Sequence, residues 1–108
     1  IAEYNYVNNM LQGVQKTYYP GKKIQTEQEF LDNIEHGFIK EYYENGKIKS
    51  EGNYVKGVVQ GVWKDYTEEG LLQFQGSYVN GEREGKWHEY DATGKIINTV
   101  NYSKGQKK

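Results

Sequence analysis

A repeat of 24 residues constrains this chain more than any other feature of its sequence. Stepping by that period from Gly37 reaches Gly61 and Gly85, and stepping back reaches Gly13. Several further columns keep the same frame: Tyr18, Tyr42, Tyr66 and Tyr90; Tyr6, Phe30, Tyr54, Tyr78 and Tyr102; Gly46, Gly70 and Gly94; Gly57, Gly81 and Gly105; Gly52 and Gly76; Trp63 and Trp87. Repetition at this period is typical of stacked supersecondary units, each packed on its neighbours.

The repeat divides the chain into units. We predict one repeat domain, 1–108, of about four and a half repeats. It has a half repeat at 1–12, a degenerate repeat at 13–36 and three clear repeats at 37–60, 61–84 and 85–108. Because the chain begins in the middle of a repeat, we expect further repeats upstream of it.

Each unit carries two turn signals separated by strands. "ENGK", "EEGL" and "ATGK" place Gly46, Gly70 and Gly94 where tight hairpin turns require positive φ, and "VKGV", "VNGE" and "SKGQ" mark the second turn. Between the turns, Leu72 and Phe74 alternate with polar residues, which is typical of a half-buried strand. The predicted fold is all-β: an elongated antiparallel meander of stacked β-hairpin repeats.

The composition agrees with a thin β structure. Hydrophobic residues make up 35% of the chain, but it has eleven Tyr, three Phe and two Trp, with thirteen Gly and one Pro. Aromatic residues favour strands and glycines favour turns. We therefore expect thin packing dominated by aromatic rings.

One segment also fits a helix. In "TEQEFLDNIEHG" (26–37), Thr26 and Glu29 have capping-box spacing and Gly37 suits a helix C-cap. Phe30 and Gly37, however, both fall in their repeat columns. We predict strands here, with the helix as the alternative.

The strand register has two solutions. A two-residue loop at Asn45-Gly46 pairs Trp63 with Gly76, whereas a three-residue loop pairs Tyr66 with Leu72. Pro20 suits the second position of a type I turn, which favours the longer loop. Trp63 and Tyr66 differ in parity, so a bulge is needed to bring both to one face.

Several functional classes find little support. The net charge of −1 disfavours nucleic-acid binding, and no apolar run approaches the roughly 20 residues of a transmembrane segment. The chain has no Cys, and His36 and His88 lie in unrelated columns, so we expect no metal site and no cofactor. The acidic residues are scattered among lysines, and no catalytic residues are predicted. We expect a protein that is not an enzyme.

The aromatic columns are the candidate binding residues. They are Trp63, Tyr66, Trp87, Tyr90 and Tyr42. One interpretation is that these rings simply pack the thin core. The other is an exposed row of rings that binds an extended peptide, a glycan or a partner's loop, because Tyr and Trp combine a large contact area with a polar group.

The repeat resembles a known family of repeats. Its core resembles the Tyr-x-Gly-x-Trp-x-x-Gly core of MORN repeats at "FQGSYVNG" (74–81) and "SEGNYVKG" (50–57). The bacterial variant of that repeat is resembled more closely by "GVWKDYTEEG" and "GKWHEYDATG". The resemblance covers essentially the whole chain. The first full unit differs from the family pattern at two places. There "PGKK" replaces the usual Asn-Gly-Lys, and Asn33 stands where the other units have Gly. The resemblance implies a curved sheet of β-hairpins. It further implies an interaction or scaffolding module, with some relatives lipid-associated and many bacterial ones described as putative antitoxins.

Three function classes follow. The first is a protein-interaction or scaffold module, with an antitoxin-like role as one form; the second is a cell-wall or glycan binder; the third is a membrane-surface, lipid-associated module. The partner is expected to be another protein. Unpaired edge strands near 4–7 and 97–102 also favour self-association. The compartment, bacterial cytoplasm or cell envelope, stays open.

Overall fold

The computed structural model describes residues 2–108, and they form strands and turns without a helix. The strands are β1 (Ala2–Glu3), β2 (Tyr6–Val7), β3 (Met10–Leu11), β4 (Gly13–Tyr18), β5 (Ile24–Leu31), β6 (Ile34–Tyr42), β7 (Ile48–Val55), β8 (Val58–Val59), β9 (Gly61–Tyr66), β10 (Leu72–Val79), β11 (Glu82–Tyr90), β12 (Ile96–Ser103) and β13 (Gln106–Lys107). The predicted all-β fold is confirmed.

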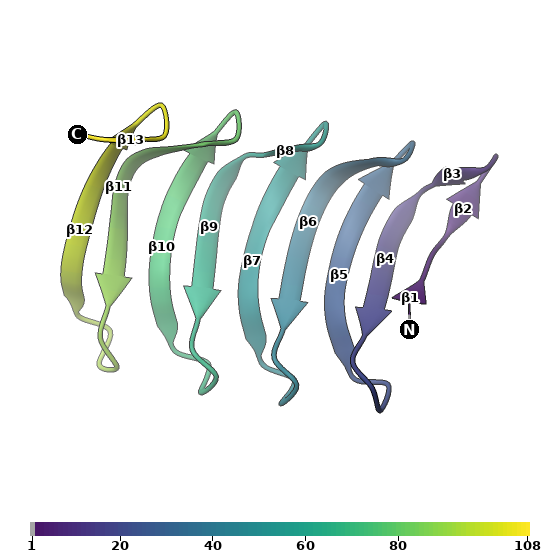
Figure 1. Cartoon of the computed structure of the whole chain (residues 1–108), viewed down its shortest axis with the longest axis horizontal. Coiled ribbons are helices and arrows are strands. Elements are labelled where there is room, and N and C mark those ends of the chain that lie inside the picture. The colour runs from purple at the N-terminus through teal and green to yellow at the C-terminus, as the bar shows by residue number, and fades with distance from the viewer. Residues whose placement is uncertain (1) are drawn as a thin grey trace.

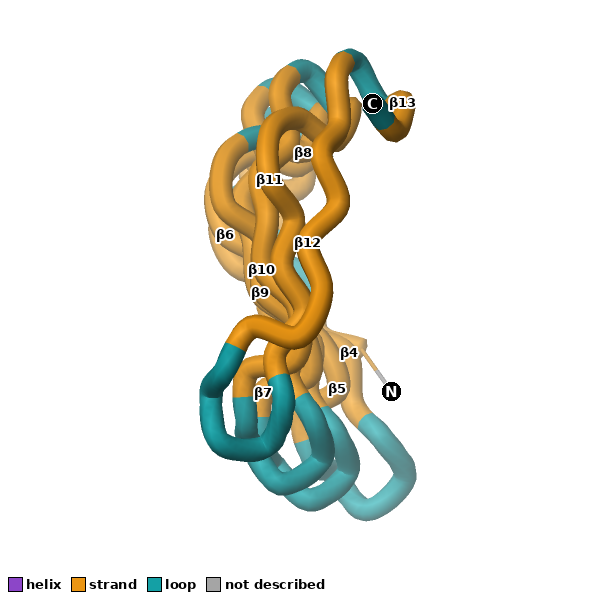
Figure 2. The backbone as a smooth tube through the Cα atoms, turned by 90° about the vertical axis from the view of Figure 1, so that its left-hand side faces the viewer, coloured by secondary structure: helices purple, strands orange, loops and turns teal. Residues whose placement is uncertain are grey.

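The strands form one long antiparallel sheet. Its order is β1-β4-β5-β6-β7-β9-β10-β11-β12-β13, with β8 paired to β7, while β2 and β3 form a small sheet of their own. Figure 1 shows successive hairpins side by side along the long axis, with the termini at opposite ends. The molecule measures 46 × 32 × 14 Å, so the described residues make a single layer, whose strands are bowed in side view (Figure 2).

The segment that also fitted a helix is a β-hairpin. β5 and β6 pair through Phe30 and Glu35, and Asp32 and Asn33 form the turn at φ 51° and 69°. Asp and Asn tolerate this left-handed conformation better than most residues. The strand interpretation is therefore confirmed, because pairing with both neighbouring strands outweighs the local helical pattern.

The short turns link each repeat to the one before it. Lys56-Gly57, Asn80-Gly81 and Lys104-Gly105 all have positive φ at both positions, as two-residue hairpin turns of the primed type require. Each of these glycines also donates its N–H to the preceding repeat: Gly57 to Glu35 O at 2.8 Å, Gly81 to Val59 O at 3.0 Å and Gly105 to Arg83 O at 2.9 Å. The hairpin tips are thereby joined by backbone hydrogen bonds.

The turns at the opposite end are three-residue loops. Tyr43 N donates to Lys47 O and Gly46 N to Tyr43 O, both at 2.9 Å. Gly46, Gly70 and Gly94 have φ of 87°, 91° and 88°, as predicted. The predicted turn type at Pro20 is wrong, because Gly21 follows it at φ 94°, a value that belongs to type II and not to type I turns.

Both predicted registers occur together. Gly76 lies opposite Trp63 and Leu72 lies opposite Tyr66, because a bulge between Leu72 and Phe74 absorbs one residue. The bulge lies in β10, so the alternation within β9 is not interrupted. Trp63 and Tyr66 therefore point to opposite faces of the sheet.

Candidate functional site

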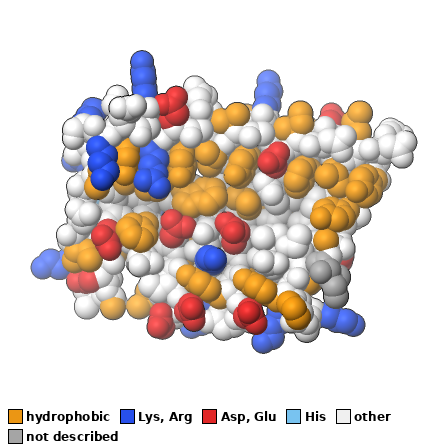
Figure 3. All heavy atoms as spheres, in the orientation of Figure 1, with side chains coloured by type: hydrophobic (Ala, Val, Ile, Leu, Met, Phe, Trp, Pro, Cys, Tyr) orange, Lys and Arg blue, Asp and Glu red, His pale blue; other side chains and the backbone are white. Residues whose placement is uncertain are grey.

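The two faces of the sheet carry different side chains. Because successive residues of a strand point to opposite sides, Trp63, Gly76 and Trp87 share one side, which we call the aromatic face. Lys64, Glu51 and Tyr66 share the other side, which we call the ladder face. Figure 3 shows a band of hydrophobic side chains running along the sheet, with acidic side chains below it.

Rings on the aromatic face pack edge to face in a series. Trp63 and Tyr78 have centroids 6.0 Å apart, Tyr78 and Trp87 5.1 Å, and Trp87 and Tyr102 6.2 Å. Such T-shaped pairs are the favoured geometry of aromatic rings. Trp87 and Tyr102 are only 9% and 8% exposed, so they form the hydrophobic core of this thin sheet as well as part of its surface.

The glycine column exists to make room for these rings. A Cβ atom on Gly76 would lie 2.0 Å from Trp87, and one on Gly52 would lie 2.1 Å from Trp63. Each indole therefore lies directly over the backbone of the neighbouring strand, where only glycine leaves space. The paired Gly and Trp columns of the sequence are one packing unit.

Arg83 extends the aromatic series with a cation. Its guanidinium lies 4.8 Å from the Trp87 ring centroid and 5.4 Å from that of Tyr102, within the range of cation–π attraction. Its Nη1 donates to the Tyr102 hydroxyl at 3.0 Å. Hydrogen bonding to Tyr78, and then to Tyr102, raises the pKa of Arg83, so this group stays charged.

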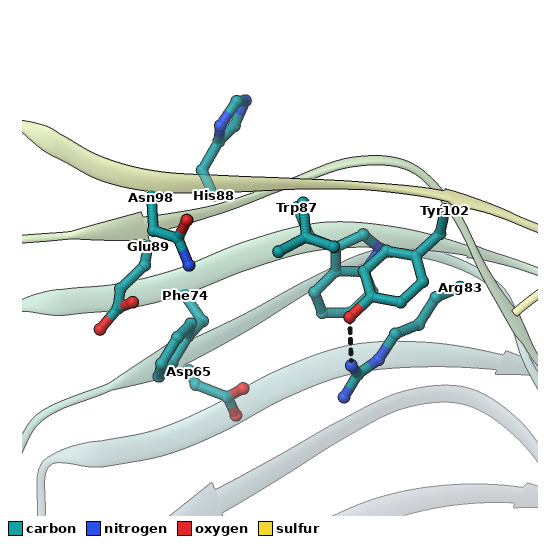
Figure 4. Close-up of a pocket in the computed structure, with 9 residues that line it drawn as sticks. Asp65, Phe74, Arg83, Trp87, His88, Glu89, Asn98 and Tyr102 are labelled. Carbon is teal, nitrogen blue, oxygen red and sulfur yellow. Dashed lines mark hydrogen bonds between the residues drawn. The ribbon is translucent and has the colours of Figure 1, made fainter. Parts of the chain in front are cut away.

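A hollow of about 280 Å³ opens beside these rings. It is lined by Asp65, Phe74, Arg83, Trp87, His88, Glu89, Asn98, Val100 and Tyr102. Figure 4 shows Arg83, Trp87 and Tyr102 at one end and Asp65, Phe74, Glu89 and Asn98 at the other, while His88 points away. Phe74 is 37% exposed and presents the most accessible ring of the hollow. The hollow is thus aromatic, with a cation at one end and carboxylates at the other.

The carboxylates of the hollow belong to a straight row across the strands. From β4 to β12 the residues directly opposite one another in this row are Thr17, Thr26, Glu41, Ser50, Asp65, Phe74, Glu89 and Asn98. Asp65 Oδ1 accepts hydrogen bonds from Ser50 Oγ at 2.8 Å and from Trp63 Nε1 at 3.2 Å. The row contains three carboxylates and no basic residue.

The ladder face carries the next row, and its charges alternate in sign. The residues opposite one another are Glu3, Lys16, Glu27, Lys40, Glu51, Lys64, Gln75, His88 and Thr99. Opposite charges directly across strands stabilise a sheet. The charges of this row therefore compensate one another, whereas the carboxylate row of the aromatic face contains no opposite charge.

Tyrosines of the ladder face bond to its glutamates. The Tyr42 hydroxyl donates to Glu27 Oε1 and the Tyr66 hydroxyl to Glu51 Oε2, each at 2.5 Å, and Tyr18 donates to Glu3 in the same way. Burial, reinforced by these hydrogen bonds, raises the pKa of Tyr42 and of Tyr66 to about 12. These phenols are therefore neutral hydrogen-bond donors at ordinary pH.

The predicted binding residues separate onto the two faces. Trp63 and Trp87 lie on the aromatic face, while Tyr42, Tyr66 and Tyr90 lie on the ladder face. Their role in binding stays a prediction. The hollow also contains residues that were not predicted, among them Arg83, Phe74 and Asp65. Arg83 is the one arginine in the sequence, a signal that could have drawn attention to it.

Residues 2–108 contain no group of three or more His, Cys, Asp or Glu side chains placed to hold a metal ion. The same residues include no helix that is long and apolar enough to cross a membrane. What the aromatic face offers chemically is a contact surface of rings, carboxylates and one guanidinium.

The fold and this face define a β-hairpin repeat protein with a surface suited to binding. A family model for the MORN repeat variant matches residues 11–32, 35–56, 59–80 and 83–104, and the chain belongs to this family. MORN repeats are non-enzymatic modules that generally bind proteins or membranes. No curated protein matches this chain closely.

Proposed function

We propose that this protein is a non-catalytic binding module for another protein, which it contacts through the aromatic face. The observation that carries the proposal is the contrast between the two rows of charge. On the ladder face, acids and bases alternate across the strands, but Glu41, Asp65 and Glu89 form a row without a base. Cations from a partner would complete that row.

The hollow supplies the apolar part of the same surface. Phe74 is 37% exposed, and Trp63 is half-buried with its ring over Gly52. Aromatic residues are enriched at protein interfaces, and a few of them dominate the binding energy. Rings beside uncompensated carboxylates therefore favour a partner that combines apolar and basic side chains.

The other functional classes fit this surface less well. An anionic membrane would meet three carboxylates on the aromatic face and a chain of net charge −1. A neutral glycan could stack on the rings but would leave the carboxylate row without a counter-charge. A basic protein segment satisfies both features of the face.

Alanine substitutions on the two faces test the proposal. Wild-type protein and the variants Trp63→Ala, Trp87→Ala, Tyr66→Ala and Tyr90→Ala are immobilised, and proteins captured from the native cell are identified and their affinities measured. We expect Trp63→Ala to weaken the captured partner by about 1–4 kcal/mol, as hot-spot rings do. Tyr66→Ala and Tyr90→Ala serve as controls from the ladder face.

Stability must be measured on the same four variants. Trp87 is only 9% exposed, so its loss should lower stability as well as binding. The proposal fails if ladder-face variants lose the partner while Trp63→Ala retains it, or if every loss of binding follows a loss of folded protein.

A further inference from the structure

The features of the aromatic face recur at the spacing of two strands. Glu41, Asp65 and Glu89 occupy alternate strands of one row, with Ser50 and Phe74 on the strands between them. Neighbouring strands lie about 4.7–4.9 Å apart, so successive carboxylates are separated by about 9.4–9.8 Å along the sheet. Trp63 and Trp87 have the same separation, because they also lie one repeat apart.

A ligand that lies along the sheet must repeat at this distance to meet each unit alike. An extended β-strand presents one side every two residues, or about 6.6–6.8 Å, and an α-helix has a pitch of about 5.4 Å. A polyproline II helix has three residues per turn and rises 3.1 Å per residue, a pitch of about 9.3 Å. Of these conformations, polyproline II matches the repeat.

The charges of the face decide what such a helix must carry. One edge of a polyproline II helix presents every third residue, so a cation at every third residue would meet Glu41, Asp65 and Glu89 in turn. The two residues between the cations would lie over the neighbouring rings. Proline-rich segments bind aromatic-lined grooves elsewhere, because their conformation is already ordered before binding.

Arg83 would orient a basic ligand on this face. It lies at the end of the hollow opposite Asp65 and Glu89, held against Trp87 and Tyr102 (Figure 4). Its charge would repel the ligand's cations from that end. A polyproline II backbone has no internal hydrogen bonds, so its carbonyl groups are open to donors such as the remaining N–H groups of Arg83.

We propose that the aromatic face binds a basic proline-rich segment in the polyproline II conformation, with a cation at every third residue, laid along the sheet across its strands. This inference rests on the proposed function, of which it names the partner class. The segment would lie with its cations over the carboxylate row and its prolines over Phe74 and the tryptophans.

Synthetic peptides test this inference. The probe is a peptide of repeated Pro-Pro-Arg triplets, compared with Gly-Gly-Arg triplets, Pro-Pro-Glu triplets and a Pro-Pro-Arg composition with its arginines clustered at one end. Binding is followed by tryptophan fluorescence, since both tryptophans lie on the aromatic face, and by calorimetry. We expect the Pro-Pro-Arg repeat to bind at least about tenfold more tightly than the Gly-Gly-Arg repeat, because less ordering entropy is lost.

Paired carboxylate variants locate the site. Glu41→Gln with Glu89→Gln should weaken the Pro-Pro-Arg peptide at least about tenfold, since two charge contacts are lost, and these changes leave the hydrogen bonds of Asp65 in place. Glu51→Gln on the ladder face is the control and should bind as wild type. Circular dichroism confirms that each variant is folded.

The inference is overturned if the Gly-Gly-Arg or clustered peptide binds as tightly as the Pro-Pro-Arg repeat, if no peptide binds, or if Glu51→Gln loses as much affinity as the paired variant. If the peptides fail while folded Trp63→Ala still loses a protein captured from the cell, the partner class is wrong and the binding function stands. If Trp63→Ala also retains that partner, the binding function fails with it.

Discussion

The two faces of this sheet are built from adjacent residues of the same strands, yet they are organised differently. Lys40 and Lys64 belong to the charge ladder, and the next residue in each case, Glu41 or Asp65, belongs to the carboxylate row of the aromatic face. Along the row of the ladder face from Glu3 to Lys64, each charge lies opposite one of the other sign. Strand alternation thus lets one face stabilise the pairing of strands while the other is free to specialise.

The two faces also differ in how they stabilise the fold. The aromatic face buries large rings over glycines, and Trp87 and Tyr102 are its most buried members. The ladder face has many cross-strand pairs, each worth about 0.2–1 kcal/mol. We therefore expect substitutions of the buried rings and their glycines on the aromatic face to have larger effects than single substitutions on the ladder face.

The largest effect should come from Trp87→Ala. This change removes a side chain that is 9% exposed and contacts Gly76, Tyr78 and Tyr102, so we expect a loss of about 3–5 kcal/mol in the free energy of unfolding. Tyr90→Ala, on the ladder face of the same strand, should cost clearly less. Urea unfolding followed by circular dichroism measures both, and equal losses would contradict the difference between the faces.

Gly76→Ala should have the next largest effect. The added Cβ would lie 2.0 Å from the Trp87 ring, so the ring or the strand must shift, and overpacking of this kind costs about 1–3 kcal/mol. The matched control is Ser77→Ala, whose side chain is on the ladder face and should change stability by less than about 0.5 kcal/mol. If Gly76→Ala is neutral, the indole does not lie on this glycine.

Lys40→Glu tests whether the ladder stabilises the sheet. It would place a third carboxylate between Glu27 and Glu51, and we expect a loss of up to about 1 kcal/mol that shrinks in high salt. Glu41→Gln, one residue along on the aromatic face, removes a charge with no opposite charge in its row and should leave stability unchanged. A loss on Glu41→Gln larger than that on Lys40→Glu would reverse the assignment of the two rows.

The smallest effect should be a loss of stability in alkali that arises on the ladder face. The pKa of Tyr42 and Tyr66 is raised to about 12, whereas an unfolded tyrosine titrates near pH 10, so folding favours the neutral phenol. Their contribution is fully present below about pH 10 and is lost as the pH rises towards 12. Tyr42→Phe with Tyr66→Phe should flatten the pH dependence of unfolding in this window.

Spectrophotometric titration checks the same point directly. Phenolate absorbance should show a component that titrates near pH 12, later than the exposed tyrosines, and this component should lose the contribution of two groups in the double Phe variant. If all tyrosines titrate near their ordinary pKa, Glu27 and Glu51 are not the hydrogen-bond partners of Tyr42 and Tyr66.

The architecture of this protein could be predicted from its repeat pattern alone. Alternation of apolar and polar residues and glycines at positive φ are local requirements of strands and tight turns, so the 24-residue columns were enough to predict the hairpins and the turns at Gly46, Gly70 and Gly94. The same columns correctly favoured a strand over a helix around Phe30. They also placed Trp63 and Trp87 among the candidate binding residues.

Which residues come into contact depends on the pairing of the strands in three dimensions. The bulge between Leu72 and Phe74 lets both predicted registers occur. Because pairing across the strands places this bulge in β10, the alternation within β9 stays intact and Trp63 and Tyr66 point to opposite faces. Arg83 stands in a column with Val59 and Glu35, so the repeat pattern did not distinguish it. It becomes part of the hollow only because β11 and β12 bring Trp87 and Tyr102 beside it. The uncompensated carboxylate row likewise appears only when the strands are in register, since charge compensation across a sheet is a property of neighbours in space.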